Sequence, residues 1–152
     1  MTGTHQVANS KATKLVALLW FAWSLLHILP GLITIDHALS ADISAISFLF
    51  PETKPEAVMR DYPGEVRAIS ITFGQHGFNL LWFGLVALVA SGFIAFRPSR
   101  VVLIVSGVVI GFADLGALFA TFIIGRIDVV GAVIFAGTGL GIGLTVFVLK
   151  ER

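Results

Sequence analysis

Residues 78–96 read FNLLWFGLVALVASGFIAF, a run of 19 residues without a charge. The run extends toward the N-terminus as far as Ile69, with polar residues only near its start, so it covers residues 69–96 and contains no Asp, Glu, Lys or Arg. At a rise of about 1.5 Å per residue, a helix of about 20 residues crosses the ~30 Å hydrocarbon core of a bilayer. Because lipid offers no hydrogen bonds to backbone groups, a segment that crosses it is helical. This stretch therefore predicts a transmembrane helix.

Three further apolar runs of similar length occur at residues 14–35, 101–124 and 129–149. Of the 152 residues, 57% are hydrophobic and 12% are charged. Soluble domains are only about 45–50% apolar and carry about 25% charged residues. We therefore expect an all-α integral membrane protein, a single domain over residues 1–152 that contains four transmembrane helices. Short connections at 97–100 and 125–128 favour an up-down-up-down bundle.

The composition also excludes several kinds of chemistry. The chain has no cysteine, which excludes disulfides, thiolate metal sites and thiol nucleophiles. The net charge is +1, so nothing in the overall balance indicates a nucleic-acid partner. No Ser-His-Asp arrangement or HExxH motif indicates a hydrolase.

The first run could also be read as a signal peptide, because Lys11 and Lys14 give it a basic start. Small residues that could be a cleavage site occur at 38–40. A polar stretch with Asp36 and His37 precedes that site and makes it a poor cleavage region. We therefore expect a retained span.

Basic residues near span ends predict the orientation, because lysine and arginine favour the cytoplasmic side. Six lie on the side of the two termini, and four lie on the opposite side among seven acidic residues. Both termini are therefore expected in the cytoplasm of a bacterial-type inner or plasma membrane, with residues 36–68 as an extracytoplasmic connector. The six are Lys11, Lys14, Arg97, Arg100, Lys150 and Arg152, and the four are Lys54, Arg60, Arg67 and Arg126.

The connector is expected to be a short amphipathic or irregular segment. Apolar side chains recur at helical spacing, at Leu39, Ile43, Ile46 and Phe50. Pro55 is typical of a second helix start, residues 62–64 of a turn, and Glu65 of the first turn of the second span. The segment either covers one end of the bundle or acts as a lid over a site.

Polar side chains inside the spans fall on one face of each helix. In the first span, Ser24 and His27 share a stripe with Trp20, and Pro30 frees the carbonyl of Leu26, which favours a kink beside His27. The second span carries Thr72, Gln75, His76 and Asn79, and the third carries Asp114 after Gly107 and Gly111.

Glycines dominate the fourth span, at Gly137, Gly139, Gly141 and Gly143. Small residues at these spacings are typical of close helix packing, which includes packing between copies in a homo-oligomer. No strand precedes them, so they do not form a phosphate-binding loop.

The depths of the polar residues predict one shared site. Counted from the outer ends of the spans, His27 and His76 lie about 10–12 Å deep, and Asn79 and Asp114 about 15 Å deep. A lone aspartate in lipid costs about 2.5–3.5 kcal/mol, and a histidine partner would relieve that cost. The candidate catalytic residues are His27, His76 and Asp114, and the candidate ligand-binding residues are Trp20, Trp23, Ser24, Thr72, Gln75, Asn79 and Trp82.

These residues favour a half-depth polar pocket for a hydrophobic small molecule or a membrane lipid. Catalysis of the acid–base type by histidine and aspartate stays open, and so does the identity of any cofactor. The alternatives are interhelical hydrogen bonds in an assembly subunit of a membrane complex, a b-type haem held by His27 and His76, and a metal held by the histidines and Asp114. Ion conduction is disfavoured because the cytoplasmic halves of the spans are almost wholly apolar.

Overall fold

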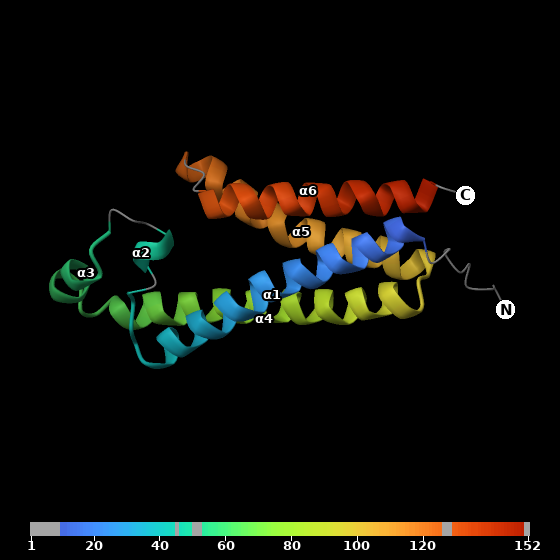
Figure 1. Ribbon diagram of the computed structural model, residues 1–152. Helices are drawn as coiled ribbons and strands as arrows, with labels where there is room; N and C mark the ends of the chain where they lie inside the picture. The colour runs from blue at the N-terminus through green and yellow to red at the C-terminus, as the bar shows by residue number, and fades with distance from the viewer. Residues whose placement is uncertain (1–9, 45, 50–52, 126–128, 151–152) are drawn as a thin grey trace. The chain divides into compact units, whose positions relative to one another are not determined.

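A computed structural model describes residues 10–44, 46–49, 53–125 and 129–150, with the backbone alone at 48–49, 117, 120–124 and 129–131 (Figure 1). The described residues form helices and no strand. Phe50, Arg126 and Arg152, discussed above, lie outside them. The helices are α1 (Lys11–Leu39), α2 (Ile46–Leu49), α3 (Pro55–Asp61), α4 (Val66–Phe96), α5 (Arg100–Ile124) and α6 (Val129–Lys150).

Three helical segments are long and apolar enough to cross a membrane: Lys11–Leu39, Val66–Phe96 and Ala132–Lys150. The expectation of an all-helical protein is confirmed for the described residues, and these three helices are candidates to span a membrane. The run predicted as the remaining span, 101–124, forms α5. That α5 also crosses the membrane, in an up-down-up-down bundle, stays a prediction.

The helix ends follow local hydrogen bonding rather than hydropathy. Ser10 precedes α1 and accepts a hydrogen bond on its Oγ from the Thr13 N–H at 3.2 Å, and Ser99 does the same for Val102 at the start of α5. α1 runs to Leu39, past the predicted end at residue 35, and α4 starts at Val66 instead of residue 69. Apolar runs mark where lipid ends, whereas a helix continues into water as long as its backbone stays bonded.

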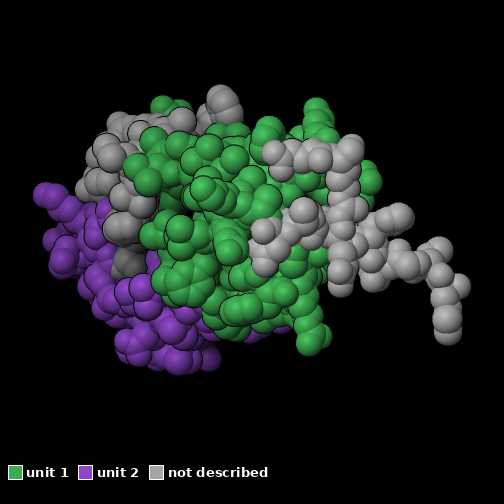
Figure 2. All heavy atoms as spheres, turned by 45° about the vertical axis from the view of Figure 1, so that its right-hand side comes forward, with its two compact units in different colours: residues 1–26, 83–152 green, residues 27–82 purple. Residues whose placement is uncertain are grey.

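The chain divides into two compact units, and α1 and α4 each contribute to both. Unit 1 comprises residues 1–26 and 83–152, and unit 2 comprises residues 27–82 (Figure 2).

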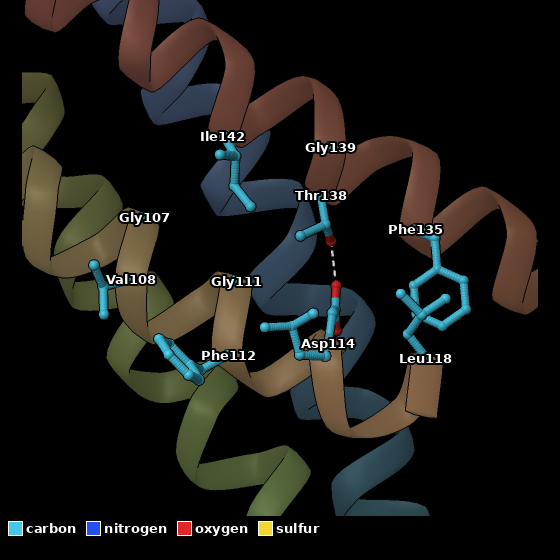
Figure 3. A pocket seen from close by; sticks show the side chains of 11 residues that line it. Gly107, Val108, Gly111, Phe112, Asp114, Leu118, Phe135, Thr138, Gly139 and Ile142 are labelled. Atoms are coloured by element: carbon cyan, nitrogen blue, oxygen red, sulfur yellow. Dashed lines mark hydrogen bonds between the residues drawn. The ribbon is translucent and has the colours of Figure 1, made fainter. Parts of the chain in front are cut away.

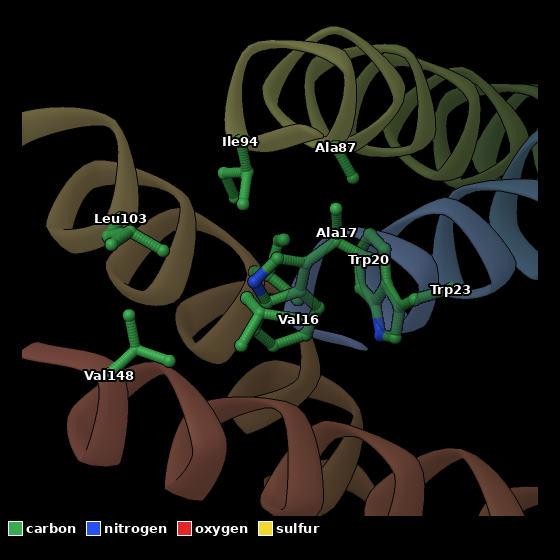
Figure 4. Close-up of a cluster of buried hydrophobic side chains, with 9 residues drawn as sticks. Val16, Ala17, Trp20, Trp23, Ala87, Ile94, Leu103 and Val148 are labelled. Carbon is green, nitrogen blue, oxygen red and sulfur yellow. The ribbon is translucent and has the colours of Figure 1, made fainter. Parts of the chain in front are cut away.

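The core of unit 1 gathers side chains from four helices around the two tryptophans of α1 (Figure 4). Gly141 on α6 makes room for Trp20, because a Cβ atom there would lie 2.6 Å from the indole Cη2. The other glycines of the α6 run, Gly137, Gly139 and Gly143, would meet no atom within 4 Å of an added Cβ. The core side chains are Val16, Ala17, Trp20, Trp23, Ala87, Ile94, Leu103, Ile110 and Val148.

The two long helices of unit 2 touch through glycine. A Cβ on Gly31 of α1 would lie 2.7 Å from the backbone nitrogen of Leu81 and 2.8 Å from the carbonyl oxygen of Gly77 on α4. In turn, a Cβ on Gly77 would lie 2.9 Å from the carbonyl oxygen of Gly31 and 3.0 Å from the backbone nitrogen of Ile35. Only glycine permits this backbone-to-backbone approach.

The connector between α1 and α4 was predicted as a short amphipathic or irregular segment, and its described residues include both short helices and irregular backbone. Leu39 ends α1, Ala41 has a positive φ of 51°, and Ile46–Leu49 forms the short helix α2. The side chain of Asp42 explains the interruption, because its Oδ1 accepts a hydrogen bond from the Ser44 N–H at 2.8 Å and so competes with helical bonding.

The other predictions for the connector concern Pro55, the turn at residues 62–64 and Glu65. Pro55 opens α3, as predicted, and a turn follows it. Glu65 lies directly before α4 rather than in its first turn, and its carbonyl accepts the Ile69 N–H at 2.9 Å.

Candidate functional site

Asp114 lies at the centre of a hydrogen-bonded cluster in unit 1. Its side chain is 5% exposed, and its Oδ2 accepts a hydrogen bond from the indole Nε1–H of Trp23 at 3.0 Å. The hydroxyl of Thr138 donates to the same carboxylate oxygen (Figure 3). The Trp23 Nε1 also lies 3.0 Å from the Thr138 Oγ1. Three helices, α1, α5 and α6, therefore meet at one carboxylate.

The facing stripes of α5 and α6 explain why Asp114 meets Thr138. On α5, Gly107, Gly111 and Asp114 follow each other at steps of four and three residues. A Cβ on Gly107 would lie 3.6 Å from Thr145 Cγ2, and one on Gly111 would lie 3.1 Å from Ile142 Cδ1. This antiparallel register continues to the Asp114–Thr138 pair.

A pocket of about 330 Å³ lies between α5 and α6 with Asp114 in its wall (Figure 3). Apart from Asp114 and Thr138, its described lining is apolar. Phe112 and Leu115 are 70% and 53% exposed, so the pocket opens at the surface of the chain. Its lining residues are Gly107, Val108, Gly111, Phe112, Asp114, Leu115, Leu118, Phe135, Thr138, Gly139 and Ile142.

Burial of Asp114 shapes the electrostatics of the pocket. A buried carboxylate loses its hydration, and the hydrogen bonds from Trp23 and Thr138 offset part of that loss. None of the described lining residues is basic. Asp114 therefore gives the wall of the pocket its acceptor character.

The three site residues predicted in the first part of α1 are all buried, but they have different surroundings. Trp23 donates its indole N–H to the Asp114 carboxylate, as described above. Ser24 donates its hydroxyl to the Phe21 carbonyl within α1 at 2.6 Å. Trp20 packs on Gly141, and its buried Nε1 has no hydrogen-bond partner among the described residues.

The site residues predicted in unit 2 do not form a buried cluster of their own. His27 is 5% exposed, whereas the remaining predicted residues, all on α4, have exposed side chains. Thr72 donates to the Ala68 carbonyl within the helix at 3.0 Å. Those exposed side chains are Thr72, Gln75, His76, Asn79 and Trp82.

The glycine contact also sets the two histidines at different levels. His76 adjoins Gly77, which lies against Thr34 and Ile35 of α1. Because Gly77 also lies against Gly31, His27 is between one and two helical turns, or roughly 6–12 Å along the axis, from the level of His76. The depths of the two histidines, counted from the outer ends of the apolar runs, did not reveal this offset. The reason is that α4 starts well beyond the level at which α1 ends.

Two features of the pocket were not recognised from sequence. Thr138 lies in the glycine-rich run of the fourth span, and neither Thr138 nor Phe112 nor Phe135 is among the predicted site residues. The spacing of Thr138, Gly141 and Thr145 at steps of three and four residues was the available sign that Thr138 faces a neighbouring helix.

The described residues contain no group of three or more histidine, cysteine, aspartate or glutamate side chains placed to hold a metal ion. Comparisons of the chain with family models, with curated proteins and with solved structures find no match. The function is therefore argued from the geometry of the site alone.

Proposed function

We propose that this membrane protein binds a hydrophobic small molecule or a lipid in the pocket between α5 and α6. The observation that carries the proposal is a buried carboxylate, Asp114, in the wall of an otherwise apolar pocket. Small-molecule sites are mostly apolar, have volumes of about 300–1,000 Å³, and contain a few oriented polar groups. The volume of about 330 Å³ is at the small end of that range.

The hydrogen bonds to Asp114 support a binding role because they hold the carboxylate in one orientation. Trp23 and Thr138 come from different helices and both donate to Oδ2. A polar group held in this way is pre-organised for a ligand and loses little freedom when the ligand binds. Acid–base catalysis by His27, His76 and Asp114 stays a sequence prediction and is not needed for this proposal.

The proposal includes a topology. Four spans, formed by α1, α4, α5 and α6, place both termini in the cytoplasm and the connector outside. The basic residues at the ends of the spans support this orientation. In this arrangement the open side of the pocket faces lipid, from which a hydrophobic ligand can enter.

A second candidate is an assembly role through α6. Gly137, Gly139 and Gly143 leave open space where a side chain would lie. Such glycines allow another helix to approach closely, either from a second copy or from another subunit. Gly139 also lines the pocket, whereas Gly137 and Gly143 do not, and this difference separates the two roles experimentally.

The test is native mass spectrometry of the gently solubilised protein and of two matched variants. Gly139→Leu places a side chain in the pocket, and Gly143→Leu adds the same side chain one turn away. We expect a retained small molecule or lipid in the unchanged chain and in Gly143→Leu, and its loss in Gly139→Leu. Equal retention in both variants contradicts the proposal. A defined oligomer that both variants disrupt, with no retained molecule, supports the assembly role instead.

A further inference from the structure

We infer that unit 2 contains a second site, a pocket between α1 and α4 that binds the acyl ester of a membrane lipid. In this site the ester carbonyl accepts a hydrogen bond from the hydroxyl of Ser70. The pocket has a volume of about 340 Å³, and no described residue lines both it and the pocket of the proposed function. Its lining residues are Ile35, Ala38, Leu39, Ser70, Ile71, Gly74 and Phe78.

The Ser70 hydroxyl is the observation that points to a ligand. Ser70 is 4% exposed, and its Oγ has no hydrogen-bond partner among the described residues. Other hydroxyls on α4 bond a carbonyl of the preceding turn. Thr72 donates to the Ala68 carbonyl at 3.0 Å, and Ser91 donates to that of Leu88 at 2.7 Å. Because a buried hydroxyl without a partner is unfavourable, a ligand that supplies the partner gains affinity.

The partner that this hydroxyl lacks is an acceptor, because its proton stays unbonded until an acceptor takes it. Ser70 lines the pocket, and rotation about its single χ1 bond can turn the hydroxyl toward a bound group. No described lining residue is charged, so a charged headgroup would lose its hydration there without a counterion. A neutral carbonyl is therefore the complementary group.

The rest of the lining suits a hydrocarbon chain attached to that carbonyl. Ser70 and Phe78 are eight residues apart on α4, which corresponds to ~12 Å along the helix axis. Apart from Ser70, the described lining is apolar. Ile71 and Phe78 are 63% and 60% exposed, so the pocket opens at the surface of the chain. An acyl chain can therefore follow α4 from the carbonyl and extend into lipid.

The position of Ser70 along the predicted span agrees with a lipid ester. Ser70 is the second residue of the apolar run at 69–96, so it lies at one end of the hydrocarbon layer in the proposed topology. The ester groups of membrane lipids lie at this boundary, between the headgroups and the chains. A lipid therefore presents its carbonyl at the level of Ser70 and its chain at the level of Phe78.

Two probes that differ in one carbonyl group test the inference: monododecanoylglycerol and its ether analogue, dodecylglycerol. Each is titrated into the unchanged protein in dodecyl maltoside, a detergent without an ester, and binding is followed by native mass spectrometry. We expect the ester to bind about five-fold more tightly than the ether, as one additional hydrogen bond permits. Infrared difference spectra with an isotope-labelled carbonyl should show a hydrogen-bonded band for the bound ester.

Variants assign this preference to the hydroxyl. Ser70→Ala should weaken ester binding to the level of the ether, leave the ether unchanged and remove the hydrogen-bonded carbonyl band. The variant should fold, because it removes a hydroxyl that bonds no described residue. Ser91→Ala, the matched control on α4, removes a hydroxyl outside the described lining and should change neither probe. Gly139→Leu, which fills the pocket between α5 and α6, should also preserve the preference.

The outcomes separate this site from the proposed function. Equal binding of ester and ether to the unchanged protein overturns the inference, as does the failure of both to bind. A preference that persists in Ser70→Ala also overturns it, and its loss in Gly139→Leu would then assign the ester to the pocket between α5 and α6. The proposed function is tested by the molecule retained in Gly139→Leu and Gly143→Leu, so either proposal can fail alone.

Discussion

The indole Nε1–H of Trp23 donates a hydrogen bond of 3.0 Å to the carboxylate of Asp114, although 91 residues separate the two in sequence. The bond joins α1 to α5, and Thr138 adds α6 to the same oxygen. In a membrane the hydrophobic effect does not drive helices together, so packing and interhelical hydrogen bonds contribute most to their association. The same carboxylate both joins helices and lines the proposed binding pocket.

Replacing Trp23 with phenylalanine removes the donor while keeping an aromatic ring. We expect Trp23→Phe to lower the free energy of unfolding by about 1–2 kcal/mol more than Trp20→Phe does. Both variants lose the same ring atoms, but the Nε1 of Trp20 has no hydrogen-bond partner among the described residues. Chemical unfolding in detergent measures the difference. Equal losses would show that the Trp23–Asp114 bond adds no stability.

Thr138→Val replaces a hydroxyl by a methyl group of similar size and leaves Asp114 with one donor fewer. We expect a loss of about 1 kcal/mol or more, because a buried carboxylate is then less well bonded. Thr145→Val is the matched control on the same helix. Its hydroxyl donates to the Gly141 carbonyl at 2.7 Å within α6, a type of bond that contributes little to stability. A larger loss for Thr145→Val than for Thr138→Val would contradict this account.

Gly31→Ala tests the contact between α1 and α4 in unit 2. The new Cβ would lie 2.7 Å from a backbone nitrogen, which cannot move as a flexible side chain would. We expect a loss of about 3 kcal/mol, the upper range for overpacking. Gly92→Ala, where nothing lies within 4 Å of an added Cβ, should be neutral or gain up to about 1 kcal/mol from helix propensity. Thermal unfolding of the two variants decides between these expectations.

The connector should lose local structure in acid. The hydrogen bond from the Ser44 N–H, followed by that from the Ser44 side chain and by His37, lowers the pKa of Asp42 below its ordinary value of 3.8. A carboxyl group whose pKa is lower in the folded chain contributes stability above the unfolded pKa, and that contribution is lost as the pH falls through the folded pKa. Protection of the Ser44 amide against hydrogen exchange should therefore fall below about pH 4.

The control for this acid response lies in the same segment. The Ile46 amide donates to the Ile43 carbonyl at 2.9 Å and involves no carboxylate, so its protection should change less. Asp42→Asn should abolish the acid response of the Ser44 amide. An unchanged response in that variant would assign the effect to another group.

The topology can be tested by labelling, because the chain has no cysteine of its own. Thr53→Cys in the connector should react with a membrane-impermeant maleimide in intact cells. Ser99→Cys, between α4 and α5, should react only after the membrane is opened. Neither change alters the charges that orient the chain. The reverse labelling pattern would show that the termini lie outside.

Features that depend on neighbouring residues in the sequence could be predicted from it. Runs of uncharged residues predicted long helices, and Pro55 predicted the start of α3, because both signals are local. The prediction for the connector left an amphipathic and an irregular segment open, because periodicity does not reveal that the Asp42 side chain bonds the nearby backbone and competes with helical bonding.

The sequence by itself predicted a helical chain with segments long and apolar enough to cross a membrane, because a helix satisfies its own backbone hydrogen bonds in lipid. It also singled out Asp114, because a carboxylate at that depth needs partners. Only the tertiary structure decided that Trp23 and Thr138 are among those partners and that the pocket lies between α5 and α6. In lipid the inner and outer faces of a helix are both apolar, so the pattern of residues does not specify rotation or register. Contacts such as Gly111 on Ile142 and Gly31 on Gly77 specify them instead.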